Sequence, residues 1–225
     1  MSKIIKDYSL KEHNSLRLNN KAQFFCEVFS EEESFEFIEF CLRKKLSITV
    51  LGSGTNVVFT KDIEGAVLKV SIPGKKINQE IVTIGAGENW HETVLWSLKN
   101  QLYGLENLSL IPGTVGAAPV QNIGAYGEEI SSKLLSLEAI NLFTNESISF
   151  DNKSCRFEYR ESEFKKDNKF LITSIKLSLN KHPVINTSYE SLYNYLVNDD
   201  IDPEKATPNQ VCRAVSAIRE RILPD

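Results

Sequence analysis

The stretch that says most about the fold reads Ile111-Pro112-Gly113-Thr114-Val115-Gly116-Ala117-Ala118-Pro119-Val120-Gln121-Asn122-Ile123-Gly124-Ala125-Tyr126-Gly127. Its glycines, prolines and small residues are too irregular for a helix or a strand. Glycine lets backbone N–H groups approach a ligand closely, and alanine and proline keep bulky side chains away. The segment therefore predicts a loop that lies against a bound diphosphate. A plain surface turn is the alternative, because most clusters of glycine and proline are only turns.

A second glycine loop lies earlier in the chain. Residues 47–51 are typical of a buried strand, residues 52–56 of a tight turn, and residues 57–59 of a second strand. The dinucleotide fingerprint of doubly wound sheets needs a third glycine and a following helix, and a triphosphate-binding loop needs a Gly-Lys-Ser/Thr ending; this turn has neither. Its pattern predicts that turn amides hold a diphosphate, with further partners in the side chains of Ser53, Thr55 and Asn56.

Three further segments complete the pattern. They are Gly85-Ala86-Gly87-Glu88-Asn89-Trp90-His91, Gly104-Leu105-Glu106-Asn107-Leu108 and Cys155-Arg156-Phe157-Glu158-Tyr159-Arg160-Glu161-Ser162. With these segments and the two glycine loops, the chain resembles the UDP-N-acetylenolpyruvylglucosamine reductases (UDP-N-acetylmuramate dehydrogenases, MurB), in the subgroup with an extra tyrosine loop. These are FAD-dependent enzymes of peptidoglycan precursor synthesis. The resemblance runs from about Asn14 to the last residue.

The resemblance implies an α+β fold, namely the two-lobed FAD-binding fold of the vanillyl-alcohol-oxidase/PCMH type. It implies a first FAD-binding lobe over residues 1–70 and a second over residues 71–225, which includes the substrate-loop segment. FAD is the expected cofactor, and no metal site is expected. The expected FAD contacts come from the two glycine loops and are Leu51, Gly52, Ser53, Gly54, Thr55, Asn56, Pro112, Gly113, Thr114, Gly116, Ala117, Gln121, Asn122, Ile123, Gly124, Ala125 and Tyr126.

The resemblance also implies a reaction. NADPH reduces FAD, and the flavin passes a hydride to the enolpyruvyl double bond of UDP-N-acetylglucosamine enolpyruvate, which gives UDP-N-acetylmuramate. Arg160 matches the family's catalytic arginine, whose guanidinium stabilises the charge that moves onto the substrate carboxylate. Tyr159 is expected to orient Arg160 and to take part in substrate binding, and Tyr189 to contact the substrate diphosphate. Without the resemblance, Arg160 reads as an ion-pair partner of Glu161 or Glu163.

Two features depart from the family. Its members continue, after the segment that matches residues 219–225, into a Gly-Asn-Ala-Gly-Ser-Phe-Phe-Lys-Asn-Pro motif that carries the serine proton donor, and then into a substrate-closing third domain. We expect both to be absent from this sequence. Ile222 stands where the family commonly has a lysine that contacts the substrate diphosphate, and losing such a charge-assisted bond costs about 1.5–3 kcal/mol. We therefore expect impaired or no activity from this chain alone.

Three interpretations stay open from the sequence. The chain is a reductase in shortened form, a non-catalytic homologue that binds FAD or a nucleotide sugar, or a flavin oxidase of the same fold class that acts on a sugar or an alcohol. Many matching positions in the glycine loops favour the reductase over the oxidase. Downstream DNA that encodes the missing serine motif would count against the non-catalytic homologue.

Composition limits the partners of the chain. A quarter of the residues are charged, the formal charge is −4 and the mean hydropathy is −0.23, so we expect neither nucleic-acid nor membrane binding. The first residues carry charges where a signal peptide needs an apolar core, and no apolar run approaches about 20 residues. We expect a cytoplasmic monomer whose partner is a small molecule. Scattered cysteines favour buried, reduced thiols.

Local signals predict several helices and strands. Ser30 and Glu33 form a capping box before a helix with the expected apolar face Phe35, Ile38, Cys41 and Leu42. Strands are expected over residues 65–70, 80–85, 134–140, 147–150 and 170–179. A second helix is expected to end at Gly104 and to bury Trp90, Val94, Leu95, Leu98 and Leu102. Thr207 and Gln210 form another capping box, before a last helix with the stripe Val211, Ala214, Val215, Ile218 and Ile222.

Overall fold

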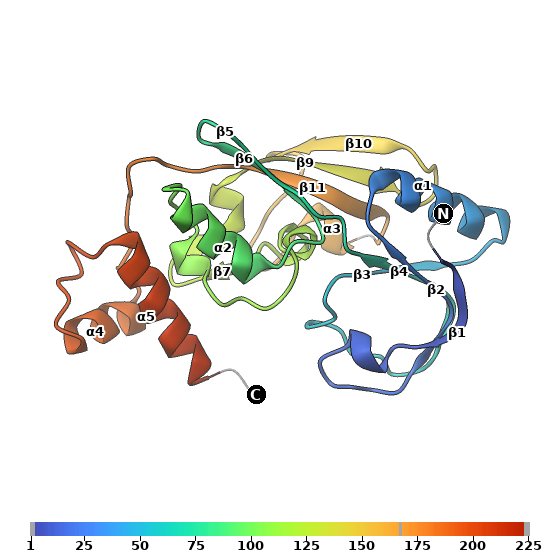
Figure 1. Ribbon diagram of the computed structural model, residues 1–225, viewed down its shortest axis with the longest axis horizontal. Coiled ribbons are helices and arrows are strands. Elements are labelled where there is room, and N and C mark those ends of the chain that lie inside the picture. Colours follow the sequence, from blue (N-terminus) through green and yellow to red (C-terminus); the bar gives the residue numbers. More distant parts are fainter. Residues whose placement is uncertain (1–2, 167, 223–225) are drawn as a thin grey trace.

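A four-stranded sheet comes from the first part of the chain. The computed structural model describes residues 3–166 and 168–222 (Figure 1). The strands of this sheet lie in the order β1 (Ile5–Ser9), β2 (Lys21–Val28), β4 (Ile63–Val70) and β3 (Ile48–Leu51). β2, β4 and β3 are parallel, and β1 is antiparallel to β2. Helix α1 (Glu31–Arg43) connects β2 to β3, as a crossover within a parallel sheet requires.

A five-stranded antiparallel sheet forms the second layer. Its strands lie in the order β10 (Ser147–Asp151), β9 (Leu134–Asn141), β11 (Phe170–Ser178), β6 (Ile81–Gly85) and β5 (Lys75–Asn78). The strands predicted over residues 47–51, 65–70, 80–85, 134–140, 147–150 and 170–179 correspond to β3, β4, β6, β9, β10 and β11 and are confirmed to within two residues at each end. β1, β2 and β5 were not predicted, because their sequences are short or mix charged and apolar residues without clear turn signals.

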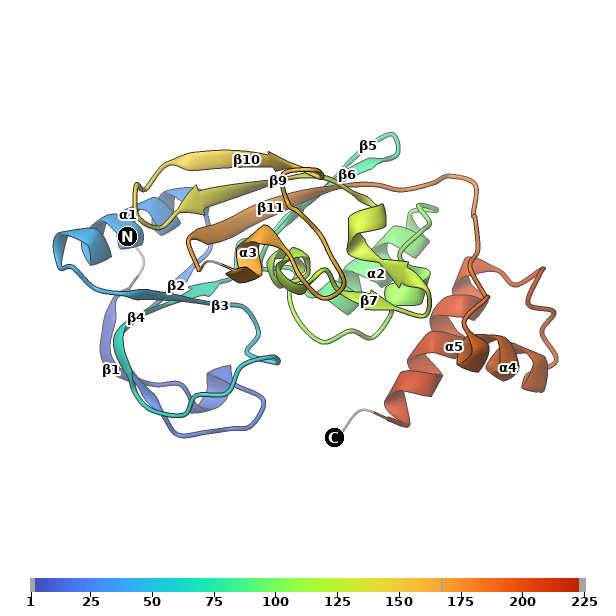
Figure 2. The ribbon, with the colours of Figure 1, turned by 180° about the vertical axis from the view of Figure 1, so that it is seen from behind.

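The other elements are helices, single turns and one short ribbon. They are α2 (Trp90–Lys99), α3 (Glu163–Lys166), α4 (Glu190–Asn198), α5 (Pro208–Glu220), the 3-10 turns η1 (Lys11–His13), η2 (Glu106–Leu108), η3 (Val115–Ala117), η4 (Pro119–Gln121) and η5 (Ile130–Ser132), and a ribbon of β7 (Gly124–Ala125) and β8 (Glu128–Glu129). Both views show α4 and α5 at the opposite end of the molecule from the four-stranded sheet, with α2 between them (Figure 2).

Helix α1 joins the two sheets. Ser30 Oγ accepts a hydrogen bond from the Glu33 N–H at 3.2 Å, which confirms Ser30 as the N-cap. The second bond of the predicted capping box differs, because the Glu33 carboxylate accepts from the Phe29 N–H at 2.7 Å. The buried side chains of α1 pack in a core that also contains Ile140 and Leu171 of the five-stranded sheet. Glu31 at the start of the helix accepts a hydrogen bond from the Thr173 hydroxyl of β11 at 2.6 Å. The two sheets therefore share one packed helix.

The main core lies on one face of the five-stranded sheet. It is made by apolar side chains of β6, β9 and β11, which pack against α2, against the segment 102–123 and against Cys212 of α5. Trp90 is its largest side chain, and the indole N–H donates to the Leu108 carbonyl at 2.8 Å. At the start of α5, Thr207 and Gln210 make both bonds of the predicted capping box, which is confirmed. This core holds the segment 111–123 against the sheet.

Three side chains predicted on buried helix faces are exposed. They are Leu42, Leu95 and Ile222. The buried face of α2 contains Trp90, Thr93, Val94, Ser97 and Leu98, and Leu95 lies about 100° away from Val94 around the helix. Leu42 lies at the end of α1, beside the buried Cys41, and Ile222 lies beyond the last residue of α5. In each case the apolar stripe is narrower or shorter than the sequence predicts.

Helix α2 ends earlier than predicted. It stops at Lys99 rather than at Gly104, because Gln101 adopts a left-handed conformation with φ of 57°. The Leu102 N–H then donates to the Ser97 carbonyl at 2.9 Å and closes the helix end. Glycine is the usual residue for this conformation. Because position 101 is glutamine, the sequence did not indicate that the helix ends there.

Residues 57–59 do not form the predicted second strand. They belong to a loop that runs from β3 to the parallel strand β4. Phe59 is buried in a small core with Leu10, Leu51 and Val67, whereas Val58 is exposed. The alternation of apolar residues that suggested a strand comes from this loop packing. The prediction of a strand-turn-strand unit was therefore wrong.

Two further observations concern membrane-spanning helices and the cysteine side chains. No helix among the described residues is long and apolar enough to cross a membrane. The four cysteines are buried, as predicted, and no disulfide joins them within the described residues: Cys26, Cys41, Cys155 and Cys212. Burial raises the pKa of both Cys41 and Cys155 to about 12, so these thiols stay protonated and unreactive near neutral pH.

Candidate functional site

A cavity of about 390 Å³ lies between the two glycine loops. One wall is β3 with residues 52–57, and the other is the segment 111–123. Thirteen of the predicted FAD contacts line it: Leu51, Gly52, Ser53, Gly54, Thr55, Asn56, Pro112, Gly113, Thr114, Gly116, Ala117, Gln121 and Ile123. The fold therefore brings the two loops, which are far apart in the sequence, to opposite sides of one space.

Direct contacts hold the two loops together. Asn56 Nδ2 on the first loop donates to Gln121 Oε1 on the second at 3.1 Å. A Cβ at Gly52 would lie only 2.7 Å from Thr114 Oγ1, so a side chain there would force Thr114 to move. On the first loop, Ser53 Oγ and Thr55 Oγ1 lie 3.3 Å apart. The hydroxyl and amide groups that were expected as diphosphate partners are thus gathered in one place.

Both loops also present unused backbone donors. In residues 3–166 and 168–222, the N–H groups of Ser53, Gly54 and Thr55 donate to no protein acceptor, and neither do those of Gly113 and Thr114. All five residues line the cavity. Neighbouring peptides that point several N–H groups into one concavity form an anion-binding site. These donors would suit a diphosphate.

The glycines of the two loops serve different purposes. Gly113 has φ of 137°, and a Cβ there would meet only Thr55 Oγ1 at 3.8 Å, so this glycine faces the cavity. Gly54 instead packs against protein, because a Cβ there would overlap the His13 carbonyl oxygen. Gly116 is also packed, since a Cβ there would lie 2.5 Å from Ala86 Cβ. Gly113 therefore leaves its side of the cavity open, and its φ requires glycine, whereas close packing explains the other two glycines.

Four predicted FAD contacts lie outside the cavity lining: Asn122, Gly124, Ala125 and Tyr126. Asn122 is buried in a left-handed conformation, and its side chain bonds to Glu129, to the Glu158 carbonyl and to the Ser131 N–H. Tyr126 packs edge-on against Tyr189, with ring centroids 5.3 Å apart. Contact between these four residues and the cofactor stays a prediction.

Arg160 is held by backbone carbonyl groups. Its guanidinium donates to the Asn122 carbonyl at 3.3 Å and to the Gly124 carbonyl. Its centre lies 5.4 Å from the ring centroid of Tyr159, which is itself 81% exposed. Glu161 pairs with Lys165 at 3.8 Å and Glu163 with Arg156 at 3.3 Å, so both candidate ion-pair partners of Arg160 have other partners. The remaining N–H donors of the guanidinium can meet an anion.

A second arginine near Arg160 was missed by the sequence analysis. Arg219 of α5 is partly buried, and its Nε donates to the Leu110 carbonyl at 3.1 Å. Burial lowers the pKa of Arg219, the charge of Arg160 lowers it further, and Tyr126 acts in the opposite direction. A guanidinium nevertheless stays charged at any ordinary pH. The positive charges of Arg160 and Arg219 thus act on each other and favour a nearby anion.

The Leu110 peptide fixes the start of the second loop. Its N–H donates to His91 Nδ1 at 3.0 Å, and its carbonyl accepts from Arg219. Leu110 adopts a left-handed conformation with φ of 53°, which is uncommon for leucine. Bonds from α2 and α5 therefore hold a strained residue directly before Ile111. His91 acts as a structural hydrogen-bond partner, as its position at the start of a helix indicates.

Another part of the cavity wall comes from residues that no motif marked. They lie in and after α3, where Phe164, Lys165, Asn168, Phe170 and Ile172 line the cavity. Lys165 Nζ donates to the Arg160 carbonyl at 2.8 Å, so the cavity and the arginine are connected by one side chain. The sequence analysis did not predict that these residues line the cavity. Their position depends on the pairing of β11 with β6 and β9, which no local sequence pattern indicates.

Comparisons with known proteins point to one family. A family model described as an FAD binding domain matches residues 22–142. The chain is 43% identical to the UDP-N-acetylenolpyruvoylglucosamine reductase of Flavobacterium johnsoniae, over 99% of this chain and 67% of that protein. It is 40% identical to the enzyme of the same name from Polynucleobacter asymbioticus, over 100% of this chain and 66% of that protein. The chain thus spans about two thirds of the length of the curated relatives that it matches.

Solved structures agree on the fold. The UDP-N-acetylenolpyruvylglucosamine reductase of Thermus caldophilus superimposes with a TM-score of 0.72 at 19% identity, over 100% of this chain and 71% of that chain. The 6-hydroxy-D-nicotine oxidase of Arthrobacter nicotinovorans gives a TM-score of 0.62 at 16% identity, over 80% of this chain and 42% of that chain. The predicted two-lobed α+β FAD-binding fold of the vanillyl-alcohol-oxidase/PCMH type is confirmed.

Proposed function

Because the chain belongs to the UDP-N-acetylenolpyruvoylglucosamine reductase family, we propose that it binds FAD in the cavity between its two glycine loops and acts in the reduction of UDP-N-acetylglucosamine enolpyruvate. NADPH is the proposed hydride source and becomes NADP⁺. The substrate double bond gains a hydride at one carbon and a proton at the other, which gives UDP-N-acetylmuramate. The proposal covers the cofactor, the reductant and the substrate together.

The observation that carries this proposal is the set of unused donors in the cavity. Ser53, Gly54 and Thr55 line the same cavity as Gly113 and Thr114, and none of their N–H groups bonds to an acceptor in the part of the chain that the structure describes. Hydroxyl and amide side chains lie beside them. A diphosphate offers several acceptor oxygens, and charge-assisted bonds to backbone N–H groups are strong. Such a cradle, next to a mainly apolar wall, fits the diphosphate and the ring system of a flavin dinucleotide.

Arg160 and Arg219 are proposed to recognise the substrate. FAD, when bound, supplies the hydride carrier. Arg160 is proposed to bind the substrate carboxylate and to stabilise the negative charge that develops on it during reduction. Bonds to the Asn122 and Gly124 carbonyls fix the guanidinium in advance, so little reorganisation is needed when substrate binds. The exposed side chains of Tyr159 and Tyr189 are proposed to contact the substrate beside it.

A charge substitution at Thr55 tests where the diphosphate binds. Thr55 is exposed, lines the cavity and faces Gly113 on the opposite loop. A carboxylate about 4 Å from a phosphate costs roughly 1–4 kcal/mol. Thr55→Asp should therefore weaken FAD binding at least ~10-fold, in a flavin fluorescence titration of the purified chain. Asparagine has the shape of aspartate without its charge, so the FAD dissociation constant of Thr55→Asn should stay within about threefold of the wild-type value.

The titration also separates the possible outcomes. Flavin absorbance that stays with the wild-type protein through gel filtration supports a competent cofactor site. A folded wild-type chain that takes up no added FAD would contradict the proposal. Equal affinities for Thr55→Asp and Thr55→Asn would place the diphosphate elsewhere in the cavity.

A further inference from the structure

A loop near the amino terminus lies directly behind the first glycine turn. We call residues 10–20 the brace. Its two ends are joined by a hydrogen bond from the Leu10 N–H to the Asn20 carbonyl at 2.8 Å. Leu10 is fully buried and packs with Leu51 and Val67, so the base of the brace belongs to the core of the four-stranded sheet. None of the brace residues lines the cavity.

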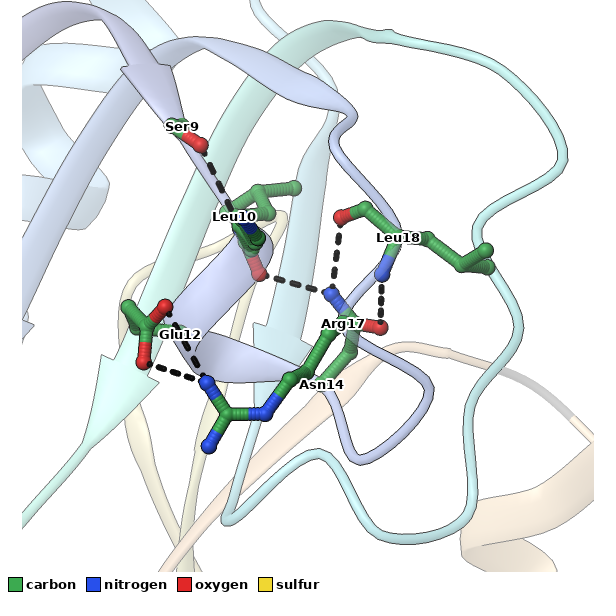
Figure 3. Close-up of polar contacts among 7 residues, drawn as sticks. Ser9, Leu10, Glu12, Asn14, Arg17 and Leu18 are labelled. Atoms are coloured by element: carbon green, nitrogen blue, oxygen red, sulfur yellow. Dashed lines mark hydrogen bonds and ion pairs between the residues drawn. The ribbon is translucent and has the colours of Figure 1, made fainter.

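The buried side chain of Asn14 organises the brace. Its Nδ2 donates to the Leu10 carbonyl at 2.7 Å and to the Leu18 carbonyl at 3.1 Å, and its Oδ1 accepts from the Leu18 N–H at 2.9 Å (Figure 3). Asn14 is only 5% exposed. One amide group thus ties the chain before it to the chain after it, and both of its polar atoms have partners.

The brace contacts the glycine turn at Gly54. The Ser15 N–H donates to the Gly54 carbonyl at 3.2 Å. On the same side, the space that a side chain at Gly54 would need is filled by the His13 carbonyl group. Gly54 has φ of 72°, and its other side lines the cavity. The residue is therefore held between Asn14's immediate neighbours and the ligand space.

We infer that the brace holds residues 52–56 in their anion-binding conformation and that Asn14 is the positioning residue for this turn. The inference rests on the proposed function, because it assigns the turn to the FAD diphosphate. A cradle of free N–H groups binds well only if the groups already point to one place, since ordering a flexible loop on binding reduces affinity. The bonds of Asn14 supply this order from outside the cavity.

Substitution of Asn14 tests the inference, with two controls. Asn14→Ala should weaken FAD binding about 10-fold or more, because the Gly54 contacts lose their support. Val67→Ala removes packing from the same core and should lower the melting temperature while leaving the FAD dissociation constant within about twofold. Arg17→Ala removes only an exposed ion pair with Glu12, at 3.3 Å, and should change neither quantity measurably.

A comparison of the variants separates positioning from a general loss of stability. The inference is overturned if folded Asn14→Ala binds FAD as tightly as wild type, or if Val67→Ala weakens FAD as much as Asn14→Ala at an equal loss of melting temperature. A wild-type chain that binds no FAD would refute the proposed function itself.

Hydrogen exchange on the wild-type chain gives a test that needs no variant. FAD should slow amide exchange in residues 13–18, which are outside the cavity but contact the turn through the Ser15–Gly54 hydrogen bond and through His13. Asn14→Asp keeps the acceptor for the Leu18 N–H and loses both donor bonds, so it should bind FAD more weakly than wild type even if Asn14→Ala fails to fold. Unchanged exchange in residues 13–18 on saturation with FAD would contradict the coupling.

Discussion

Arg160 adopts a left-handed backbone conformation with φ of 54°, which is uncommon for a residue with a long side chain. Lys165 Nζ bonds to its carbonyl, and the Asn122 and Gly124 carbonyls accept from its guanidinium. Contacts at both ends of the residue thus maintain the conformation. Strained residues that the surroundings hold in place are found at sites where a side chain needs one fixed direction.

Substitution of this residue should separate substrate binding from cofactor binding. Arg160→Lys should weaken UDP-N-acetylglucosamine enolpyruvate binding about 10-fold or more, since hydrogen bonds to charged groups contribute about 1.5–3 kcal/mol and a lysine cannot reproduce the planar fork. The flavin absorbance of the FAD-loaded chain reports this binding. The FAD dissociation constant should not change. Arg156→Lys, at an exposed ion pair, is the matched control, and equal losses in both variants would remove Arg160 from its assigned role.

The helices show which local signals predict structure. The capping residues Ser30 and Thr207 marked the starts of α1 and α5 correctly, because a side chain that bonds to its own helix acts over three residues. Residues 57–59 were wrongly predicted to form a strand. Phe59 is apolar because it packs in a core with Leu10, which is distant in the sequence. Local patterns record that a residue is buried, but they do not record which partner buries it.

The cap of α1 gives a prediction at this level. Ser30→Ala should lower the free energy of unfolding by about 1 kcal/mol, because the Glu33 N–H loses its acceptor at the helix start. Urea denaturation followed by circular dichroism measures this change. Glu36→Ala, at an exposed position within the same helix, should have little effect. If the two variants have equal stability, the contribution of the cap is negligible and α1 depends only on its packing between the sheets.

At the scale of the whole molecule, the candidate site combines parts that only the tertiary fold brings together. The sequence predicted both glycine loops and Arg160, since these lie in recognisable motifs. It did not predict that Arg219 of α5 lies near Arg160, that Lys165 contacts the Arg160 carbonyl, or that the brace fills the space behind Gly54. Such relations depend on how strands and helices pack, and no local spacing encodes them.

The position of the cavity predicts how FAD affects stability. Its walls come from both loops, so a ligand that bonds to both should bind the folded chain and not the unfolded one. At a free FAD concentration 100 times the dissociation constant, the free energy of unfolding should rise by about 2.7 kcal/mol. Urea denaturation with and without FAD measures this increase. Thr55→Asp should show little of it at the same FAD concentration, whereas Thr55→Asn should show nearly all of it. A similar increase in Thr55→Asp would mean that FAD stabilises the chain from a different site.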